Sequence, residues 1–267
     1  MRRSLAPCLA LALLATGCMR RAHDEPDAFT WQGPAAPGTT LHLRDIAGNI
    51  SVRASADSLV HVTASKHWRH GGASAVGFAV ARHGAELDVC ALFGGGTCAA
   101  TGYRRHNSGF HRILGIAWGS DMRADFVVTV PPGVAVDAST VSGDVAVDGA
   151  QAPLTLRTTN GNVFAATHVG PIGATTINGS IAAFEDSLPP GAGSTSATTV
   201  NGDVMVAAPA NLGATLDLST INGSVTTDFP VPVQGTHGTR RAQGTVGTGG
   251  APVILHAVNG SVTLRKR

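Results

Sequence analysis

A short phrase built around one glycine recurs along this chain and constrains its fold more than any other feature. It reads TVSGDVAV, TTNGNVFA, TTINGSIA, TTVNGDVMV, STINGSVT and AVNGSVTL. The shared glycines are Gly48, Gly143, Gly161, Gly179, Gly202, Gly223 and Gly260, and from Gly143 to Gly223 they lie 18 to 23 residues apart. Self-similarity at such a period is typical of repeat proteins, in which each unit stacks on the previous one.

Equivalent positions in the copies carry the same kind of residue. A threonine precedes most of the glycines by three positions, and a valine or isoleucine follows each glycine by two. Asparagine and glycine both tolerate a left-handed backbone, so we expect each copy to be a strand, an Asn-Gly corner and a second strand. The predicted structural corners are Asn160 and Gly161, Asn178 and Gly179, Asn201 and Gly202, Asn222 and Gly223, and Asn259 and Gly260.

The repeat predicts an all-β fold, and two architectures compete for it. An Asn-Gly pair between strands is a strong hairpin signal, which makes a β-sandwich the alternative. A meander of hairpins gives no reason for the flanking columns to recur, whereas equivalent residues of a β-solenoid stack about 4.8 Å apart. We therefore expect a single-chain β-solenoid of stacked Asn-Gly-cornered coils. The threonine column and the apolar column next to it have opposite parity, so the pattern leaves open which of them faces the core.

Composition agrees with a turn-rich β protein and narrows the function. Charged residues make up 13% of the chain, and 34 of its 267 residues are glycine. Both values depart from the usual composition, in the direction of turns and away from charged surface helices. The formal net charge of +2 is too small to indicate a nucleic-acid partner. No cofactor motif is present in the sequence, and we expect none to be bound.

The first eighteen residues resemble a bacterial lipoprotein signal peptide. A basic MRRS start is followed by a short apolar run, and LATGC ends at Cys18. The resemblance implies that Cys18 is lipidated and anchors the protein in the cell envelope, most simply in the outer membrane facing the periplasm or the surface. Residues 19–38 hold several prolines and little periodicity, so we expect a flexible tether. The β-strand repeat domain is then expected over residues 39–267, with an irregular insertion at about 66–123.

Two cysteines remain after the signal peptide, at Cys90 and Cys98 in CALFGGGTC. In an oxidising envelope, a pair that flanks a glycine-rich loop most simply forms a disulfide. A metal site is the rival interpretation, because His106 and His111 follow. The spacing lacks the short Cys-x2-4-Cys knuckle of structural zinc sites, so we expect no metal.

The insertion is the segment where ligand contacts are expected to gather. It is rich in aromatic, histidine and arginine residues, and such loops on a rigid scaffold often bind partners. The candidate ligand patch for an anionic envelope glycan or a protein partner consists of Trp68, Tyr103, Arg104, Arg105 and His106. For the insertion as a whole, the interpretation that we favour is that it caps the open end of the solenoid.

Catalysis is weighed separately, because some β-helices act on polysaccharides. Asp144 and Asp203 share the position after the glycine, but they belong to coils three apart. Stacking at about 4.8 Å per coil separates them by about 14 Å, which exceeds the spacing of glycosidase carboxylate pairs. We therefore expect no enzyme activity and name no catalytic residue.

The order ADFVVTVPPGVAVDASTVSGDVAVDG, followed by TTNGNV, TINGSI and TVNGDV, resembles the bacterial putative-adhesin family of β-strand repeat proteins, a domain of unknown function. The resemblance covers about Thr39 to Arg267. It implies a right-handed β-helix-like fold on the outer side of the cytoplasmic membrane and supplies no established catalytic residue. The sequence thus predicts a non-catalytic envelope lipoprotein that is an adhesin-like binding or structural module. The alternatives are an accessory or sensor protein of an envelope stress or signalling system and, third, a polysaccharide-acting enzyme.

Overall fold

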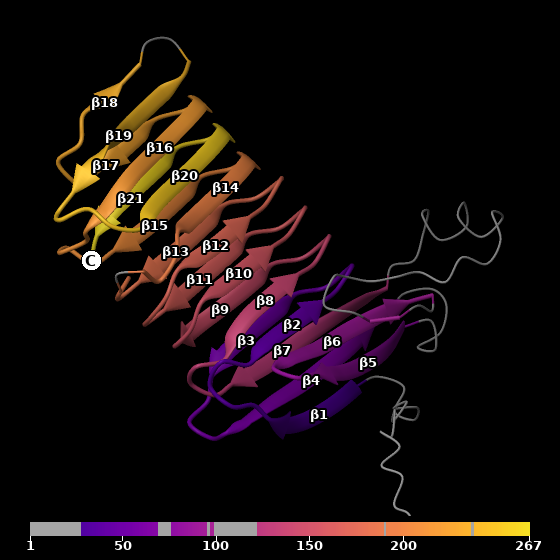
Figure 1. Cartoon of the computed structure of the whole chain (residues 1–267). Coiled ribbons are helices and arrows are strands. Elements are labelled where there is room, and N and C mark those ends of the chain that lie inside the picture. The colour runs from indigo at the N-terminus through magenta and orange to yellow at the C-terminus, as the bar shows by residue number, and fades with distance from the viewer. Residues whose placement is uncertain (1–27, 69–75, 95–96, 99–121, 190, 236–237) are drawn as a thin grey trace, which may run out of the picture.

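The computed structural model describes residues 28–68, 76–94, 97–98, 122–189, 191–235 and 238–267. Within them, all regular secondary structure is β-strand, and the strands form two large sheets that run along an elongated body (Figure 1). Most neighbouring strands in the two sheets are parallel. Among these residues, no helix has the length and apolar character needed to cross a membrane.

The first sheet, sheet A, contains ten strands. In spatial order they are β1 (Ala28–Pro34), β4 (Leu59–His67), β7 (Arg123–Val130), β3 (Ile50–Ala54), β9 (Val145–Ala150), β11 (Val163–Thr167), β13 (Ile181–Glu185), β15 (Val204–Ala208), β21 (Val262–Lys266) and β17 (Val225–Thr227).

The second sheet, sheet B, contains eleven strands. Their order is β18 (Val233–Gln234), β19 (Arg240–Val246), β16 (Ala214–Asn222), β20 (Pro252–Asn259), β14 (Thr195–Asn201), β12 (Ile172–Thr175), β10 (Leu154–Arg157), β8 (Ala135–Ser139), β2 (Thr40–Arg44), β6 (Glu86–Phe93) and β5 (Val76–His83).

Each copy of the repeat contributes one strand to sheet B and, after the glycine corner, one strand to sheet A. Equivalent residues of successive copies are paired: Leu154 lies opposite Ile172 in sheet B, and Val163 lies opposite Ile181 in sheet A. The leucine, valine and isoleucine columns face each other between the sheets and form one continuous buried core. Columns that recur in the sequence are therefore columns of stacked neighbours in space.

The structure shows that the threonine column, and not the apolar column next to it, is buried near the corner. The threonines three positions before the glycine point inward, and Thr176 and Thr199 are almost fully buried. Their hydroxyls donate to glycine carbonyls of the neighbouring coil, as Thr176 Oγ1 does to Gly161 O at 2.9 Å. The apolar residues two positions before the glycine lie on the surface, where Ile177 is 44% exposed. The chain turns between these two columns, and this turn accounts for their opposite parity.

The order of the coils in space differs from their order in the sequence. The last strand pair, β20 and β21, lies between β14 and β15 on one side and β16 and β17 on the other (Figure 1). Residues between β17 and β20 form β18 and β19, and β19 pairs antiparallel with β16. This hairpin explains the longer gap before the last glycine and covers the C-terminal end of sheet B.

Two predicted boundaries need correction at the N-terminal end. The expected tether over residues 19–38 is too long, because Ala28–Pro34 form β1 and pair antiparallel with β4. The insertion at about 66–123 is not irregular throughout. It contains β5 and β6, which form an antiparallel hairpin, and β6 continues sheet B in parallel with β2. Apolar alternation in these strands is what draws them onto the core.

Candidate functional site

Side-chain amides form a ladder along the corners of the repeat. Asn178 Nδ2 donates to Asn160 Oδ1 at 2.7 Å, and Asn201 Nδ2 donates to Asn178 Oδ1 at 2.8 Å. The ladder continues from Asn259 to Asn201 and from Asn222 to Asn259 with the same donor and acceptor atoms. Each of these hydrogen bonds contributes about 1 kcal/mol net. The asparagines therefore hold neighbouring coils together.

The residues directly after the glycines form a second ladder. Asp144 Oδ1 accepts a hydrogen bond from Asn162 N at 2.7 Å, and Asp203 Oδ1 accepts one from Ser261 N at 2.7 Å. Between the strands that follow these two aspartates, β9 and β15, lie β11 and β13. Each carboxylate thus satisfies a backbone N–H of the next coil, which is a structural role.

The corner is replaced by a long segment in one coil. β6 pairs with β2 and β7 pairs with β3, whereas β2 and β3 are themselves joined by the corner at Gly48. Along the chain, residues 94–122 connect β6 to β7, whereas the other coils connect their two strands through a short corner. In the coil of β2 and β3, Asp45 takes the position that threonine has in most other copies. Burial raises the pKa of Asp45 to about 7, because hydrogen bonds from the backbone N–H groups of Ile46 and Ala47 offset only part of the desolvation.

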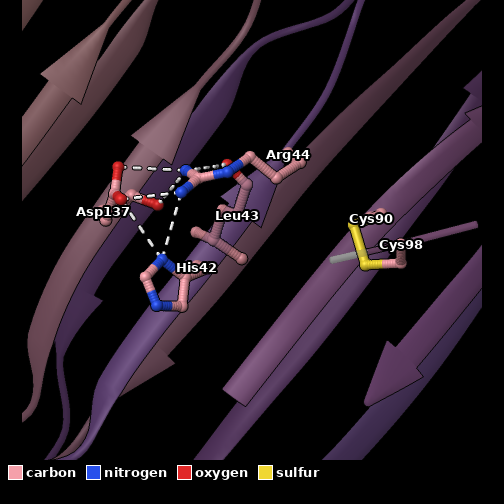
Figure 2. The surroundings of a disulfide bond; sticks show 6 residues. All are labelled: His42, Leu43, Arg44, Cys90, Cys98 and Asp137. Atoms are coloured by element: carbon pink, nitrogen blue, oxygen red, sulfur yellow. Dashed lines mark hydrogen bonds and ion pairs between the residues drawn. A yellow bond between two sulfur atoms is a disulfide. The ribbon is translucent and has the colours of Figure 1, made fainter. Parts of the chain in front are cut away.

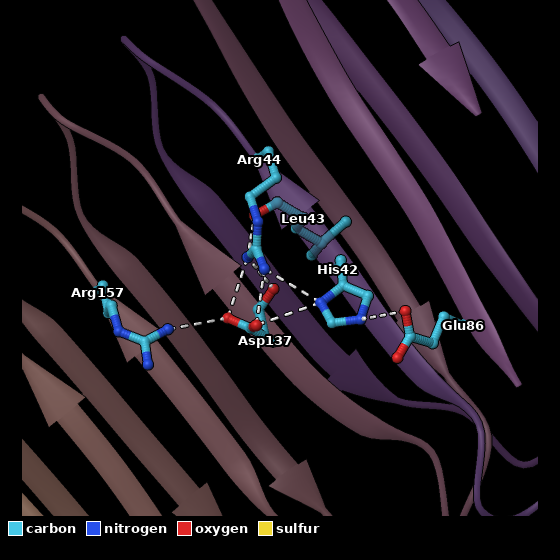
Figure 3. A network of polar contacts seen from close by, with 6 residues as sticks. All are labelled: His42, Leu43, Arg44, Glu86, Asp137 and Arg157. Atoms are coloured by element: carbon cyan, nitrogen blue, oxygen red, sulfur yellow. Dashed lines mark hydrogen bonds and ion pairs between the residues drawn. The ribbon is translucent and has the colours of Figure 1, made fainter. Parts of the chain in front are cut away.

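A polar network lies on the outer face of sheet B, and Figure 3 shows its members on β2, β8, β10 and β6. Asp137 is its centre. Arg44 Nη1 donates to Asp137 Oδ1 at 3.0 Å and Arg44 Nη2 donates to Oδ2 at 2.6 Å, a two-pronged contact. His42 Nδ1 lies 3.2 Å from Asp137 Oδ2, and Arg157 Nη1 donates to Oδ1 at 3.3 Å. His42 Nε2 faces Glu86 Oε2 at 3.8 Å. The network links four neighbouring strands.

The charge state of Asp137 follows from these contacts. Burial alone would raise its pKa, but the hydrogen bonds and charge of Arg44, the charge of Arg157 and the hydrogen bond of His42 outweigh it. The pKa of Asp137 therefore lies below its usual range, and the carboxylate is ionised at neutral pH. The next residue on this face, Asp88 on β6, is fully buried, and its oxygens have no hydrogen-bond partner within the described residues.

The disulfide lies on the same face. Cys90 and Cys98 are bonded, with 5.7 Å between their Cα atoms, and Cys90 is the register partner of Arg44 (Figure 2). The bond ties the first residues after β6 back onto the sheet, next to the polar network. The start of the 94–122 segment is thus fixed on a rigid base. In the part of the chain that the structure describes, no group of three or more His, Cys, Asp or Glu side chains is arranged to hold a metal ion.

Of the predicted ligand patch, the structure describes Trp68, which is half-buried directly after β4. Tyr103, Arg104, Arg105, His106 and the lipidation residue Cys18 lie outside the described residues. Sequence reasoning missed the polar network. A signal for it was present, because His42 and Asp137 both lie six positions before a repeat glycine, and Arg44 and Arg157 both lie four before one.

We expect Asp137→Asn to lower the free energy of unfolding at pH 7 by about 1 to 3 kcal/mol, because it removes the negative charge that accepts two hydrogen bonds from Arg44. Because the pKa of Asp137 is lower in the folded than in the unfolded state, its ionised form stabilises the folded protein at pH values above the unfolded pKa. This stabilisation is lost as the pH falls through the folded pKa. The difference between variant and wild type should therefore vanish in acid. Urea unfolding of the variant and the wild type, at pH 7 and at an acidic pH below the folded pKa of Asp137, measures this difference.

Asp217→Asn is the control, since Asp217 pairs with Arg241 in a more exposed setting. It should cost under about 1 kcal/mol. An equal loss in Asp137→Asn and Asp217→Asn at pH 7 would contradict the central role of Asp137.

Comparison with known proteins gives a family and several distant likenesses. A model of the family Toastrack DUF4097 matches residues 120–265. A putative cell adhesion protein from Clostridium sporogenes is 8% identical, with 90% of this chain and 100% of that chain covered and a TM-score of 0.47. A putative adhesin from Bacteroides fragilis is 9% identical, with 90% and 97% covered and a TM-score of 0.32. Among curated proteins the sequence has no match.

Proposed function

The chain belongs to the Toastrack DUF4097 family, and from this premise we propose that it is a non-catalytic lipoprotein of the cell envelope. Its right-handed β-solenoid serves as the scaffold of an adhesin-like binding or structural module. The family match spans the repeat from the end of the insertion to the last strand, so the proposal concerns the body of the chain and what it carries.

One observation carries the non-catalytic part of the proposal. The polar columns that recur through the chain are engaged in holding coils together: amide to amide, carboxylate to backbone N–H, and hydroxyl to carbonyl. A side chain that a ladder fixes in this way is poorly placed to exchange protons with a substrate. The repeat is therefore best understood as a scaffold. We expect recognition surfaces where the repeat is interrupted, or where the outer face of a sheet carries residues that are not part of the recurring polar columns.

The base of the 94–122 segment supports a binding role at the N-terminal end. The disulfide and the Asp137 network fix the strands from which the segment leaves. Rigid support of this kind lowers the entropic cost of presenting a loop to a partner. Trp68, Tyr103, Arg104, Arg105 and His106 remain the predicted patch, with an envelope glycan or a protein as its partner.

The sequence of the N-terminus supports the envelope anchor. Nine residues separate Cys18 from the first residue of β1. Fully extended, they span about 30 Å. A lipid on Cys18 would therefore keep the N-terminal end of the sheets close to the bilayer surface, with the stack of coils extending away from it.

Replacing Cys18 by alanine tests the anchor. In the native host, Cys18→Ala should abolish incorporation of a labelled fatty acid and move the protein from the membrane fraction to the soluble periplasmic fraction. Cys8→Ala changes a cysteine inside the signal segment and should leave both readouts as in the wild type. Labelling and membrane fractionation that persist in Cys18→Ala would refute the lipoprotein proposal.

A further inference from the structure

The outer face of sheet A carries an apolar surface that the ladders do not explain. Between β9 and β15 its outward residues are Ala146, Asp148, Phe164, Ala166, Ala182, Phe184, Met205 and Ala207, and only Asp148 on β9 is charged. Phe164 is 39% exposed, and Phe184 and Met205 are half-buried. The two phenyl rings lie side by side, with their centroids 5.5 Å apart. We call Phe164, Phe184 and Met205 the aromatic platform.

Charged side chains border the platform on one side. The Arg267 guanidinium lies 5.9 Å from the centre of the Phe184 ring, and its Nη1 donates to Asp186 Oδ1 at 2.8 Å. His168 Nδ1 contacts the other oxygen, Asp186 Oδ2. All three side chains are at least one-third exposed. The carboxylate of Asp186 is thus held in one orientation beside an exposed aromatic surface.

A second arginine adds positive charge at the β21 side of the platform. Arg265 is exposed and lies on the same face as Phe184, two strands away through Ala207. Guanidinium groups bind carboxylates with two parallel hydrogen bonds, which favours a planar anionic ligand. Asp186 also lines an adjoining cleft of about 370 Å³, together with Leu188, Asn211, Thr248 and Gly250. Flat apolar contact, fixed polar groups and an exposed arginine, Arg265, therefore meet at one place.

We propose that the aromatic platform and its cationic border bind an acidic polysaccharide. One face of a uronic acid ring packs against Phe164 and Phe184, and its carboxylate pairs with Arg265 and Arg267. Asp186 accepts hydrogen bonds from ring hydroxyls that point toward the cleft. This inference rests on the proposed binding role and assigns it a ligand class and a second surface, separate from the 94–122 segment.

The charge and the size of the surface favour this occupant over a second copy of the chain. A stable protein interface buries about 800 Å² on each partner. The platform has only three large side chains, two of them half-buried, and covers much less than that area. A sugar ring matches its dimensions, and an acidic ring complements the arginines at its border.

The test is calorimetric titration of the full-length protein with two probes, a hexamer of galacturonic acid and a neutral hexamer of glucose. The acidic hexamer should bind more tightly than the neutral one, and its affinity should fall as salt rises. Phe164→Ala and Phe184→Ala should each weaken binding of the acidic hexamer about tenfold. Arg265→Gln should weaken it and reduce the salt dependence.

Control variants come from the same sheet face. Val127→Ala removes an exposed apolar side chain from β7, and Arg53→Gln removes an exposed cation from β3. Both should bind the acidic hexamer as the wild type does. Loss of binding in these controls, equal affinity for the two hexamers, or unchanged binding in Phe164→Ala would overturn the proposal. So would a dimer of the wild-type protein that Phe164→Ala dissociates in light scattering.

Failure of this inference can be told apart from failure of the proposed function. Sedimentation of the Cys18→Ala protein, which lacks the proposed lipid, with isolated host envelopes measures the binding role without reference to any sugar. Envelope binding that persists when Phe164→Ala is added to this protein, together with no affinity for the acidic hexamer, rejects the platform and leaves the binding module intact. Absence of envelope binding by the Cys18→Ala protein rejects the binding role itself.

Discussion

Replacing Gly202 by alanine is expected to lower the free energy of unfolding by about 4 kcal/mol or more, or to prevent folding altogether. Gly202 has a φ of +144°, a region that residues with a Cβ rarely adopt. A Cβ at this position would lie 2.1 Å from the carbonyl oxygen of Gly179 in the neighbouring coil. Both the strained backbone and the overlap oppose the substitution.

The neighbouring coil has no simple way to relieve this overlap. The Gly179 carbonyl accepts a hydrogen bond from Thr199 Oγ1 at 2.8 Å, and the Gly202 carbonyl in turn packs against Gly260. Moving one corner therefore disturbs the corner on either side of it. Close-packed interiors transmit such strain to neighbouring layers because they contain few voids.

Gly173→Ala provides the control for this prediction. Gly173 is also a glycine of the repeat region, but it lies within β12, and a Cβ there would meet its nearest atom at 3.7 Å. We expect its stability to equal or slightly exceed that of the wild type, since alanine restricts the unfolded chain more than glycine does. Urea unfolding followed by circular dichroism compares the three proteins. A cost under about 1 kcal/mol for Gly202→Ala would contradict the stacked-corner geometry.

Much of the repeat could be predicted from the sequence, because stacking places equivalent residues of neighbouring copies in contact with each other. Asn178 sits between Asn160 and Asn201 both in the column and in space, so the recurrence of asparagine reported a physical contact. The same reasoning identified the β-branched column two positions after the glycines, and the structure places this column in the core. The repeat period and the recurring residue types therefore predicted contacts between residues that lie far apart in the sequence.

What the sequence could not show depends on contacts without a recurring pattern. The insertion of β20 and β21 between β14 and β16 cannot be deduced from repeats that look alike, since any coil would stack acceptably on any other. The tether expected over residues 19–38 includes β1, because β1 is a single strand whose antiparallel partner, β4, lies outside the repeat. The network of Asp137 combines residues from four strands of different copies, and its members are individually common residues.

A buried carboxyl group, Glu185, also has no counterpart in the repeat pattern, and it leads to a pH-dependent prediction. Glu185, the last residue of β13, points into the core and is fully buried. Its Oε1 accepts hydrogen bonds from the Ile172 N–H at 3.0 Å and from the Thr195 hydroxyl. Its Oε2 is buried without a hydrogen-bond partner among the described residues. Burial raises the pKa of Glu185 from 4.5 to about 7, because the two hydrogen bonds only partly offset the loss of water.

Glu185→Gln is therefore expected to make the protein more stable at pH 8 by about 3 kcal/mol, and to leave it nearly unchanged at pH 4. A carboxyl whose folded pKa lies above its unfolded pKa binds its proton more tightly in the folded state. Its contribution is fully present below the unfolded value of 4.5 and is lost as pH rises to the folded value of about 7. Glutamine retains an oxygen to accept from Ile172 and Thr195 and never ionises, so this loss disappears in the variant.

Thermal unfolding at pH 4, 6 and 8 distinguishes this mechanism from a general change in packing. The Glu185→Gln variant should diverge from the wild type only as pH rises, because the wild type alone must place a charge in the core. Asp148→Asn removes an exposed carboxylate from β9 and should show no such divergence. A constant stability difference across the three pH values would show that Glu185 acts through its shape and not through its proton. Any greater stability at acidic pH would then need another source. Asp45, which takes the threonine position before Gly48 and whose pKa burial also raises to about 7, is the group to replace next.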